Sequence, residues 1–445
     1  MRAPWSWARV GSSTSYASPW ARRNPFPEGF WWDFGGHVLF SHYRYFDRLM
    51  DTLLGKSHGW VNHQREAWIW MQNRFIPYPL QNNIHRLPKA IYWECLEGII
   101  DIQNSGASAV PDHFGAWIKA TFGKGLAKWF LTPYNNKVWA YPPEQMDWSW
   151  VGERVAPVSL KKILKNSILS ADDPSWGPNA QFRFPLHGGT GSIWRTMAGR
   201  LPSKKMYTNR EIVSLDVQQR KISFVDGATQ NYDVLFNTMP LNDLVRLAGL
   251  APSMNRIDEL KHSTTHVVGL GLKGTPPDHL ATKCWIYFPE GDCPFYRATV
   301  FSNYSPNNVP DCASQWSLML EVSQSPVKPV DSDRVVEQVI QGALNTGLVS
   351  SRRDIHHAWY RMADKGYPTP SLKRDKALLP LLEELAGLGI YSRGRFGAWR
   401  YEVGNMDHSV MQGVEFANHI VAAGEELTVW HPQIVNNPYP TGKER

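Results

Sequence analysis

Residues 30–43 read FWWDFGGHVLFSHY: an aromatic run stops at a Gly-Gly-His turn and then resumes as an apolar strand. Glycine has no Cβ atom, so the backbone at Gly35 and Gly36 can come close to another group. Loops of this layout usually deliver backbone groups to a flat or anionic ligand. The stretch therefore predicts a ligand-contacting loop formed by Gly35, Gly36 and His37.

A second glycine-rich stretch, FRFPLHGGTGSIWRTMAGRLP, covers residues 182–202 and places Gly188, Gly189 and Gly191 immediately before a predicted helix. The positive end of a helix dipole favours a negative charge or an electron-rich ring edge at that point. GGTG alone is more often an ordinary tight turn. This loop therefore supports a ligand site only in combination with other residues.

The composition favours a globular chain with a small anionic ligand. With 445 residues the chain is long enough for two or three structural units. Its 47 Lys and Arg exceed its 40 Asp and Glu, and the excess is spread along the sequence, which fits a small molecule better than nucleic acid. No apolar run approaches the roughly 18 residues of a membrane span. We expect neither a nucleic-acid partner nor a membrane partner.

The cysteines and histidines argue against a metal site and against a disulfide framework. The four cysteines, Cys95, Cys284, Cys293 and Cys312, form no CxxC pair, and no HExxH or Cys/His ligand spacing occurs. So few cysteines without pairing are typical of a reducing compartment, and we therefore expect a cytoplasmic protein. The GxSxG turn of many hydrolases is also absent.

The hydrophobic pattern divides the chain into segments of different secondary structure. Apolar residues recur with helical spacing from about residue 46 to 169, which predicts a helical insertion. Residues 209–237 alternate around a short polar turn and end in an apolar run, which predicts a hairpin that leads into a buried parallel strand. Strand-like runs between residues 266 and 323 predict a second sheet, and helices are expected near residues 332–345 and 408–424.

Several arginines lie among aromatic residues rather than in charged runs, namely Arg154, Arg297, Arg395 and Arg400. A guanidinium beside aromatic rings can bind a phosphate with two hydrogen bonds, and nearby tyrosine hydroxyls can complete such a clamp. Each arginine alone is more often the partner of a surface ion pair. A joint phosphate site requires a fold that brings the arginines together.

Seven stretches, taken in order, resemble those of eukaryotic-type UDP-galactopyranose mutases, which depend on a flavin. They read PEGFWWDFGGHVLFSHYRYFD, PYNNKVWAYP, WVGERVAP, WGPNAQFRFPLHGGTG, CPFYRATVFSNYSP, GYPTP and SRGRFGAWRYEVGNMDHS, and the likeness extends from about residue 27 to 427. The resemblance implies an α/β fold of the FAD-dependent, amine-oxidase-like type, with a helical insertion and an antiparallel substrate sheet.

The same resemblance divides the chain into modules. It implies a discontinuous FAD-binding domain over residues 26–45, 180–262 and 388–430, a helical uridine-side domain over 46–179, a substrate domain with an antiparallel sheet over 263–387, a segment unrelated to the family over 1–25, and a tail over 431–445.

The resemblance also implies a reaction. The family interconverts UDP-galactopyranose and UDP-galactofuranose through an adduct between flavin N5 and the sugar, so this chain would be an isomerase. There is no net redox change, although NADPH first reduces the FAD. The product supplies furanose for glycoconjugates such as those of cell walls. The implied partners are FAD, NADPH and the two UDP-sugars, and a homo-oligomer stays open.

Family positions match this sequence residue by residue. His37 is implied as a catalytic residue at the flavin, with a core histidine as the plain alternative, and Arg154 and Arg297 are implied to grip the diphosphate. The implied substrate positions are Gln81, Phe130, Tyr134, Asn135, Trp139, Asn179, Trp285, Tyr287, Tyr304, Tyr367, Arg395 and Tyr401. The implied cofactor positions are Gly35, Gly36, Arg65, Gly188, Gly189, Gly191, Ile212, Asn405 and Met406.

Two features depart from the family pattern and leave alternatives open. The family opens with a strand, a GxGxxG turn and a helix, and none of these precedes Phe26, so we expect the first βαβ unit to be missing. Met406 stands where the family commonly has an amide, whose donors a thioether cannot replace. Either the first residues do not represent the natural N-terminus, or the chain is a shortened, flavin-poor homologue that binds UDP-sugars without activity. A further alternative is an amine-oxidase-type FAD oxidoreductase.

Overall fold

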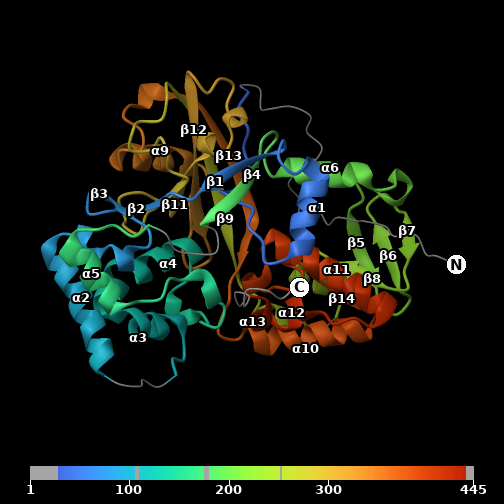
Figure 1. Cartoon of the computed structure of the whole chain (residues 1–445). Helices are drawn as coiled ribbons and strands as arrows, with labels where there is room; N and C mark the ends of the chain where they lie inside the picture. The colour runs from blue at the N-terminus through green and yellow to red at the C-terminus, as the bar shows by residue number, and fades with distance from the viewer. Residues whose placement is uncertain (1–28, 106–109, 175–179, 251–252, 437–445) are drawn as a thin grey trace.

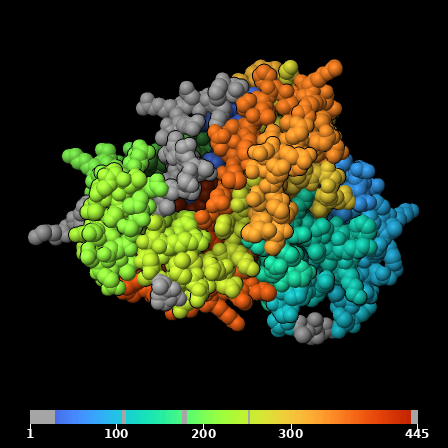
Figure 2. All heavy atoms as spheres, turned by 180° about the vertical axis from the view of Figure 1, so that it is seen from behind, coloured from blue at the N-terminus to red at the C-terminus, as the bar shows by residue number. Residues whose placement is uncertain are grey.

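The computed structural model describes residues 29–105, 110–174, 180–250 and 253–436. Figure 1 shows three parts: a large sheet, a helical module coloured blue to teal, and an α/β module coloured green to red. From behind, the helical module and the yellow-green residues of the α/β module form two separate lobes, with orange residues of the sheet region between and above them (Figure 2).

The largest sheet has seven strands in the order β13-β9-β12-β11-β10-β2-β3. Their bounds are β13 (Ile355–Pro368), β9 (His262–Lys273), β12 (Gln315–Gln324), β11 (Arg297–Val300), β10 (Trp285–Tyr287), β2 (Ala67–Met71) and β3 (Arg74–Pro77). Neighbouring strands are antiparallel apart from β10 and β2. The sheet predicted between residues 266 and 323 is therefore confirmed. Helix α9 (Val335–Asn345), also predicted, shares a hydrophobic core with it.

The aromatic run of the opening stretch packs on β9. Phe30 and Trp32 are buried, and their rings stack with centroids 5.8 Å apart. Gly269 and Gly271 make this contact possible, because a Cβ atom at either glycine would lie 2.6 Å from one of the two rings. The only GxGxxG spacing in the sequence, residues 269–274, thus begins inside a strand and serves aromatic packing rather than a phosphate-binding turn.

The helical prediction for residues 46–169 is wrong over residues 60–77. Helix α1 (Arg44–Leu54) is followed by β1 (Trp60–Gln64), β2 and β3, of which β2 and β3 extend the large sheet. Alternate residues of β2 are buried, which is the period of a strand. Gln72 and Asn73 both have a φ of 55°, as the two central residues of a tight hairpin do. A two-residue polar break between apolar runs is the sequence signal for this hairpin.

The helical insertion itself is present further along the chain. It comprises α2 (Lys89–Asn104), α3 (Phe114–Leu126), α4 (Thr132–Trp139) and α5 (Leu160–Leu169). These helices share one core with Ile69 and Ile76 from the edge of the large sheet. No helix within the described residues combines the length and the apolarity that crossing a bilayer requires.

The α/β module contains the predicted hairpin and parallel strand. Strands β5 (Ile212–Asp216), β6 (Lys221–Phe224) and β7 (Thr229–Asn231) form an antiparallel sheet, and β8 (Leu235–Asn237) pairs in parallel with β14 (Ile390–Ser392). Helix α11 (Met406–Ala422) confirms the predicted C-terminal helix.

The predicted boundary at residue 387 does not follow the packing. Helix α10 (Arg374–Gly387) contributes Leu378, Leu382 and Leu385 to the same core as Ile390 of β14. Residues 374–387 therefore belong to the α/β module and not to the domain that holds the large sheet.

Candidate active site

The two glycine loops lie beside each other. Strand β4 (Gln181–Pro185) leads into the GGTG loop and helix α6 (Gly191–Arg200) follows it. Asp33 Oδ2 accepts hydrogen bonds from the Thr190 amide at 3.1 Å and from the Thr190 hydroxyl at 2.6 Å. A Cβ atom at Gly189 would lie 2.6 Å from Asp33 Oδ1, so glycine is required for this approach. The sequence predicts a ligand at the start of α6, and the structure places the Asp33 carboxylate of the opening stretch at Thr190, directly before this helix.

The glycine-histidine loop, residues 35–37, is bound to the buried carboxylate of Glu321, which no sequence motif indicates. The Gly36 amide donates to Glu321 Oε1 at 3.0 Å. Arg297 donates to the same carboxylate through Nε at 2.9 Å and Nη2 at 2.8 Å, and the Tyr296 hydroxyl donates at 2.6 Å. The available signal was a single acid in the otherwise uncharged strand β12. Glu321 therefore joins the loop to one of the two predicted diphosphate-binding arginines.

The charges of this pair are mutually stabilised. Burial opposes ionisation of Glu321, but Arg297, the Tyr296 hydroxyl and the Gly36 amide together lower its pKa below the ordinary value. Burial would likewise lower the pKa of the Arg297 guanidinium, but Glu321 and then Tyr367 raise it well above its ordinary value. Both groups are therefore ionised at neutral pH.

Three tyrosines, Tyr134, Tyr296 and Tyr367, act electrostatically on the guanidinium of Arg297. Tyr134 and Tyr287 meet edge to face with ring centroids 5.3 Å apart, and Phe130 stacks on Tyr134 at 5.5 Å. The Tyr304 hydroxyl is buried and has no hydrogen-bond partner among the described residues. Burial raises the pKa of Tyr304 well above its ordinary value, so the phenol keeps its proton and can donate a hydrogen bond to a ligand.

Arg154 reaches the same region from the helical side. Its Cζ atom lies 5.6 Å from the ring centroid of Tyr401, and its Nη2 donates to the Glu402 carbonyl at 2.6 Å. Arg395 Cζ lies 4.8 Å from the Tyr367 ring and 5.6 Å from the Tyr401 ring. The tyrosines 367 and 401 thus connect the surroundings of Arg154 with those of Arg297.

His37 is exposed to solvent, and the charged groups of Glu321, Arg395 and Arg297 act on its imidazole. Desolvation is the main cause that lowers its pKa to about 4, Glu321 opposes the shift, and Arg395 and Arg297 add to it. The imidazole is therefore neutral at neutral pH. Gly35 has a φ of 121°, a conformation that L side chains rarely adopt, and the His37 amide donates to the Gly35 carbonyl at 2.8 Å.

The remaining predicted substrate positions differ in burial and in whether their polar atoms already have hydrogen-bond partners in the protein. Trp139 is buried against Tyr401 with ring centroids 4.7 Å apart, and the Trp285 indole N–H is buried without a partner among the described residues. Gln81 donates to the Ala156 carbonyl at 2.7 Å, and Asn135 donates to Leu131 of its own helical segment at 2.8 Å. Asn179 lies outside the described residues.

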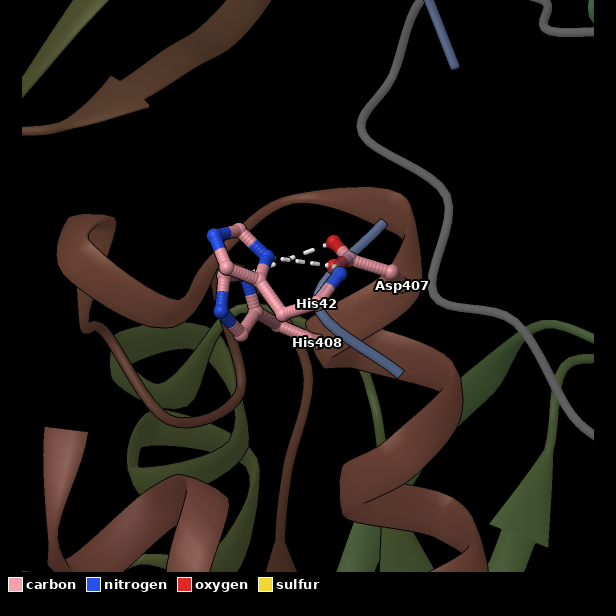
Figure 3. Close-up of side chains that lie close together, drawn as sticks. All are labelled: His42, Asp407 and His408. Atoms are coloured by element: carbon pink, nitrogen blue, oxygen red, sulfur yellow. Dashed lines mark hydrogen bonds and ion pairs between the residues drawn. The ribbon is translucent and has the colours of Figure 1, made fainter. Parts of the chain in front are cut away.

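The predicted cofactor positions at α11 lie beside a group of buried polar side chains (Figure 3). Asn405 is the N-cap residue of α11 and makes no side-chain cap, and Met406 packs on an apolar cluster. Beyond them, His42 Nδ1 lies 2.7 Å from Asp407 Oδ2, and the rings of His42 and His408 lie 4.6 Å apart. Asp407 Oδ1 and His408 Nδ1 lie 3.4 Å apart, and His408 Nε2 is buried without a hydrogen-bond partner in the described part of the chain.

This trio has the residue types of a metal site, and its ligand atoms lie within 4.8 Å of one another. Ligand atoms of one tetrahedral zinc ion are about 3.3 Å apart, given bond lengths near 2 Å. The 2.7 Å between His42 and Asp407 is instead the distance of a hydrogen bond. Burial lowers the pKa of His408 to about 3, so its ring is neutral.

Two cofactor positions lie away from this group. Ile212 begins β5 and lines a concavity beside β8. Arg65 is buried, with its Cζ 5.4 Å from the ring centroid of Tyr78.

A large cavity of about 530 Å³ does not coincide with the arginines and tyrosines. It is lined by residues 39–41, by α1 and by strands β1 and β4, including His63 and Arg183. None of the residues predicted to bind substrate lines it. We therefore place the candidate active site at the charged and aromatic cluster and not at this cavity.

Comparisons with known proteins support one family. No protein-family model matches the chain. A crystal structure of reduced UDP-galactopyranose mutase is similar, with 46% sequence identity and a TM-score of 0.89 over 93% of this chain and 88% of that chain. A putative protoporphyrinogen oxidase from Exiguobacterium sp. 255-15 is 14% identical, with a TM-score of 0.63 over 88% of this chain and 89% of that chain.

A redesigned putrescine oxidase is 12% identical, with a TM-score of 0.53 over 88% of this chain and 87% of that chain. The oxidases share the fold alone. The predicted fold class, an α/β fold of the FAD-dependent oxidoreductase type, is confirmed.

Proposed function

The chain belongs to the UDP-galactopyranose mutase family, and we propose on that basis that it is an isomerase which interconverts UDP-galactopyranose and UDP-galactofuranose. The observation that carries the proposal is the placement of Arg297. It binds Glu321, which also binds the Gly36 amide, and tyrosine hydroxyls lie close enough to act on its charge. A charged fork next to phenolic donors suits a diphosphate. The proposed partners are thus the two UDP-sugars.

Buried polar groups near the cluster fit a polar ligand. Tyr304 and Trp285 each bury a donor that has no partner among the described residues. Such groups cost roughly 1–3 kcal/mol when they stay unsatisfied. A sugar or phosphate oxygen would remove this cost. In this proposal Arg297 and Arg154 hold the diphosphate, and the aromatic residues on the helical side hold the uracil.

We propose FAD as the cofactor, and two features near α11 fit it. The helix starts without a side-chain cap for its first amides, and His408 Nε2 is buried without a hydrogen-bond partner within the described residues. The glycine loops around Gly36 and Gly189, together with Asn405, would hold the isoalloxazine. When bound and reduced, the flavin supplies a nucleophilic nitrogen for the anomeric carbon.

The residues of the chain then have three tasks. Arg297 and Arg154 orient the UDP group and stabilise its charge as the bond to the sugar breaks. His37 is neutral, so it can accept or donate a hydrogen bond at the ring without adding charge. The buried tyrosines exclude water, which would otherwise hydrolyse an activated sugar.

NADPH as reductant, membership of the eukaryotic type and a cytoplasmic location are parts of the same proposal. The similar crystal structure is of the reduced protein, which fits a cofactor that must be reduced first. All four cysteines are free, which fits a reducing compartment.

The proposal is tested by turnover of UDP-galactofuranose. Purified protein is supplied with FAD and either dithionite or NADPH, and the nucleotide sugars are separated by chromatography. We expect conversion to UDP-galactopyranose and loss of conversion in Arg297→Ala. No conversion at any FAD concentration, with UDP still bound, would support the flavin-poor binding homologue instead. Peroxide production from an amine would support the oxidase alternative.

A further inference from the structure

Glu321 holds two parts of the site with one carboxylate. Its Oε1 accepts from the Gly36 amide and from Arg297 Nε, and its Oε2 accepts from the Tyr296 hydroxyl and from Arg297 Nη2. Only 2% of its side chain is exposed, against 21% for Arg297. The carboxylate is therefore fully satisfied and shielded, whereas the arginine keeps a face toward the site.

The bidentate contact uses one edge of the guanidinium fork. Arginine has five N–H donors in a fixed plane, and the contact with Glu321 through Nε and Nη2 leaves the others directed away from the carboxylate. A guanidinium held on one edge loses little further rotamer freedom when a phosphate binds on the other. Breaking the contact would instead leave a buried carboxylate with too few donors, which is costly.

The same carboxylate fixes the loop. A Cβ atom at Gly35 would lie 3.5 Å from the Glu321 carboxylate, and one at Gly36 would lie 2.5 Å from Thr299 Oγ1. The loop backbone therefore rests directly on β11 and β12, with the Gly36 amide bound to Glu321. The position of His37 follows from that of Gly36, its neighbour in the chain.

We propose that Glu321 is a positioning residue that stays bound to Arg297 during turnover and sets the distance between the diphosphate grip and the glycine-histidine loop. This proposal rests on the proposed function. One anionic group thus orients the free edge of Arg297 toward the substrate diphosphate and holds the loop against the same strands. Substrate and cofactor are brought into register by a residue that need not touch either.

The test is Glu321→Gln, which keeps the shape but replaces one acceptor by a donor and removes the charge. We expect the Kd for UDP, measured by calorimetry, to rise about tenfold, because the Arg297 guanidinium is no longer held in place by a charged carboxylate. We also expect kcat to fall and the visible absorbance spectrum of bound flavin to shift, because the loop is released. Glu321→Asp, which keeps the charge on a shorter stem, should restore part of the UDP affinity.

A matched control separates positioning from general stability. Glu426 forms a similar buried, bidentate pair with Arg393, with side chains 5% and 3% exposed. Glu426→Gln should lower the melting temperature without the combined change in Kd and flavin spectrum. Equal effects of the two variants on all readouts would overturn the proposal.

The remaining outcomes are also distinct. Turnover by the wild-type protein with an unchanged UDP Kd in Glu321→Gln would overturn the positioning role while the proposed function stands. No turnover by the wild-type protein, combined with the tenfold loss of UDP binding in Glu321→Gln, would leave the orientation of Arg297 supported and remove the proposed function.

Discussion

Asp33 and Thr190 are separated by 157 positions in the sequence, yet the carboxylate of one binds both the amide and the hydroxyl of the other. This contact joins the loop that contains Gly36 to the loop that contains Gly189. Asp33 is only 8% exposed, and burial raises its pKa above 3.8 despite the hydrogen bonds from Thr190. A carboxylate with this role affects stability in a way that depends on pH.

Asp33→Ala should lower the free energy of unfolding by about 1–3 kcal/mol, because a buried amide and hydroxyl lose their acceptor. The folded wild-type protein binds the Asp33 proton more tightly than the unfolded chain, so this residue favours folding most below pH 3.8 and less as pH rises through the folded pKa. Asp33→Asn should remove that decline. Urea titrations between pH 4 and 7 measure both effects. Asp278→Ala, at an exposed position, is the control and should change neither the stability nor its pH dependence. The prediction is contradicted if the difference in free energy of unfolding between the wild-type protein and Asp33→Asn does not change with pH.

His37 should not titrate in the range in which most histidines do. Its pKa is lowered to about 4 from 6.5, so the unfolded chain binds the proton in this window and the folded protein does not. Stability should therefore decrease as pH is lowered from 6.5 toward 4, and His37→Gln should reduce this decrease. NMR titration of the ring measures the pKa directly. A midpoint near 6.5 would refute the environment described for the loop.

Tyr304→Phe removes a hydroxyl that has no partner in the described protein. We expect the free energy of unfolding to stay equal or to increase slightly, because no hydrogen bond is lost and a buried polar group is removed. The Kd for UDP should rise about fivefold to thirtyfold if the hydroxyl donates to the diphosphate. Denaturant titration and calorimetry measure the two quantities. Loss of stability without a change in Kd would place the hydroxyl in the core and not at the ligand.

Met406→Gln should tighten FAD binding by about tenfold, since an amide adds donors at the first residue of α11 and one such hydrogen bond contributes about 1 kcal/mol or more. Met406→Leu is the size-matched control and should bind FAD like the wild-type protein. Quenching of flavin fluorescence during titration of the apoprotein measures the affinity. If Gln binds no more tightly than Leu, the side chain at 406 does not face the flavin.

The sequence predicts those elements whose signals are local. The hairpin β5–β6 alternates clearly, and β8 is a short apolar run before Pro240, so both follow from the pattern. The β2–β3 hairpin is missed because β2, AWIWM, is apolar at every position and so shows no polar-apolar alternation, and because its turn, Gln72-Asn73, lacks glycine. A two-residue turn with positive φ at both positions usually contains glycine, and its absence hides the strands.

The candidate site follows from the sequence only in part, because its main contacts are long-range. Arg297 and Tyr304 lie in one motif and were predicted through the family resemblance. Glu321 was not, because its contact with Gly36 spans 285 positions and no spacing rule connects the two. The role of Asp33 is hidden for the same reason. Residue types predict which groups can bind a ligand, whereas the fold determines which of these groups are already bound to other parts of the protein.

The two glycines of β9 have a consequence for the whole active site. The rings of Phe30 and Trp32 can pack against β9 only because Gly269 and Gly271 have no side chains there. The loop that contains His37 follows these rings by a few residues. The distance of the loop from the sheet therefore depends on the two glycines of β9. A single methyl group added at Gly269 would lie 2.6 Å from the Trp32 ring, so Trp32 would have to move, and the loop that we propose to lie at the flavin would move with it.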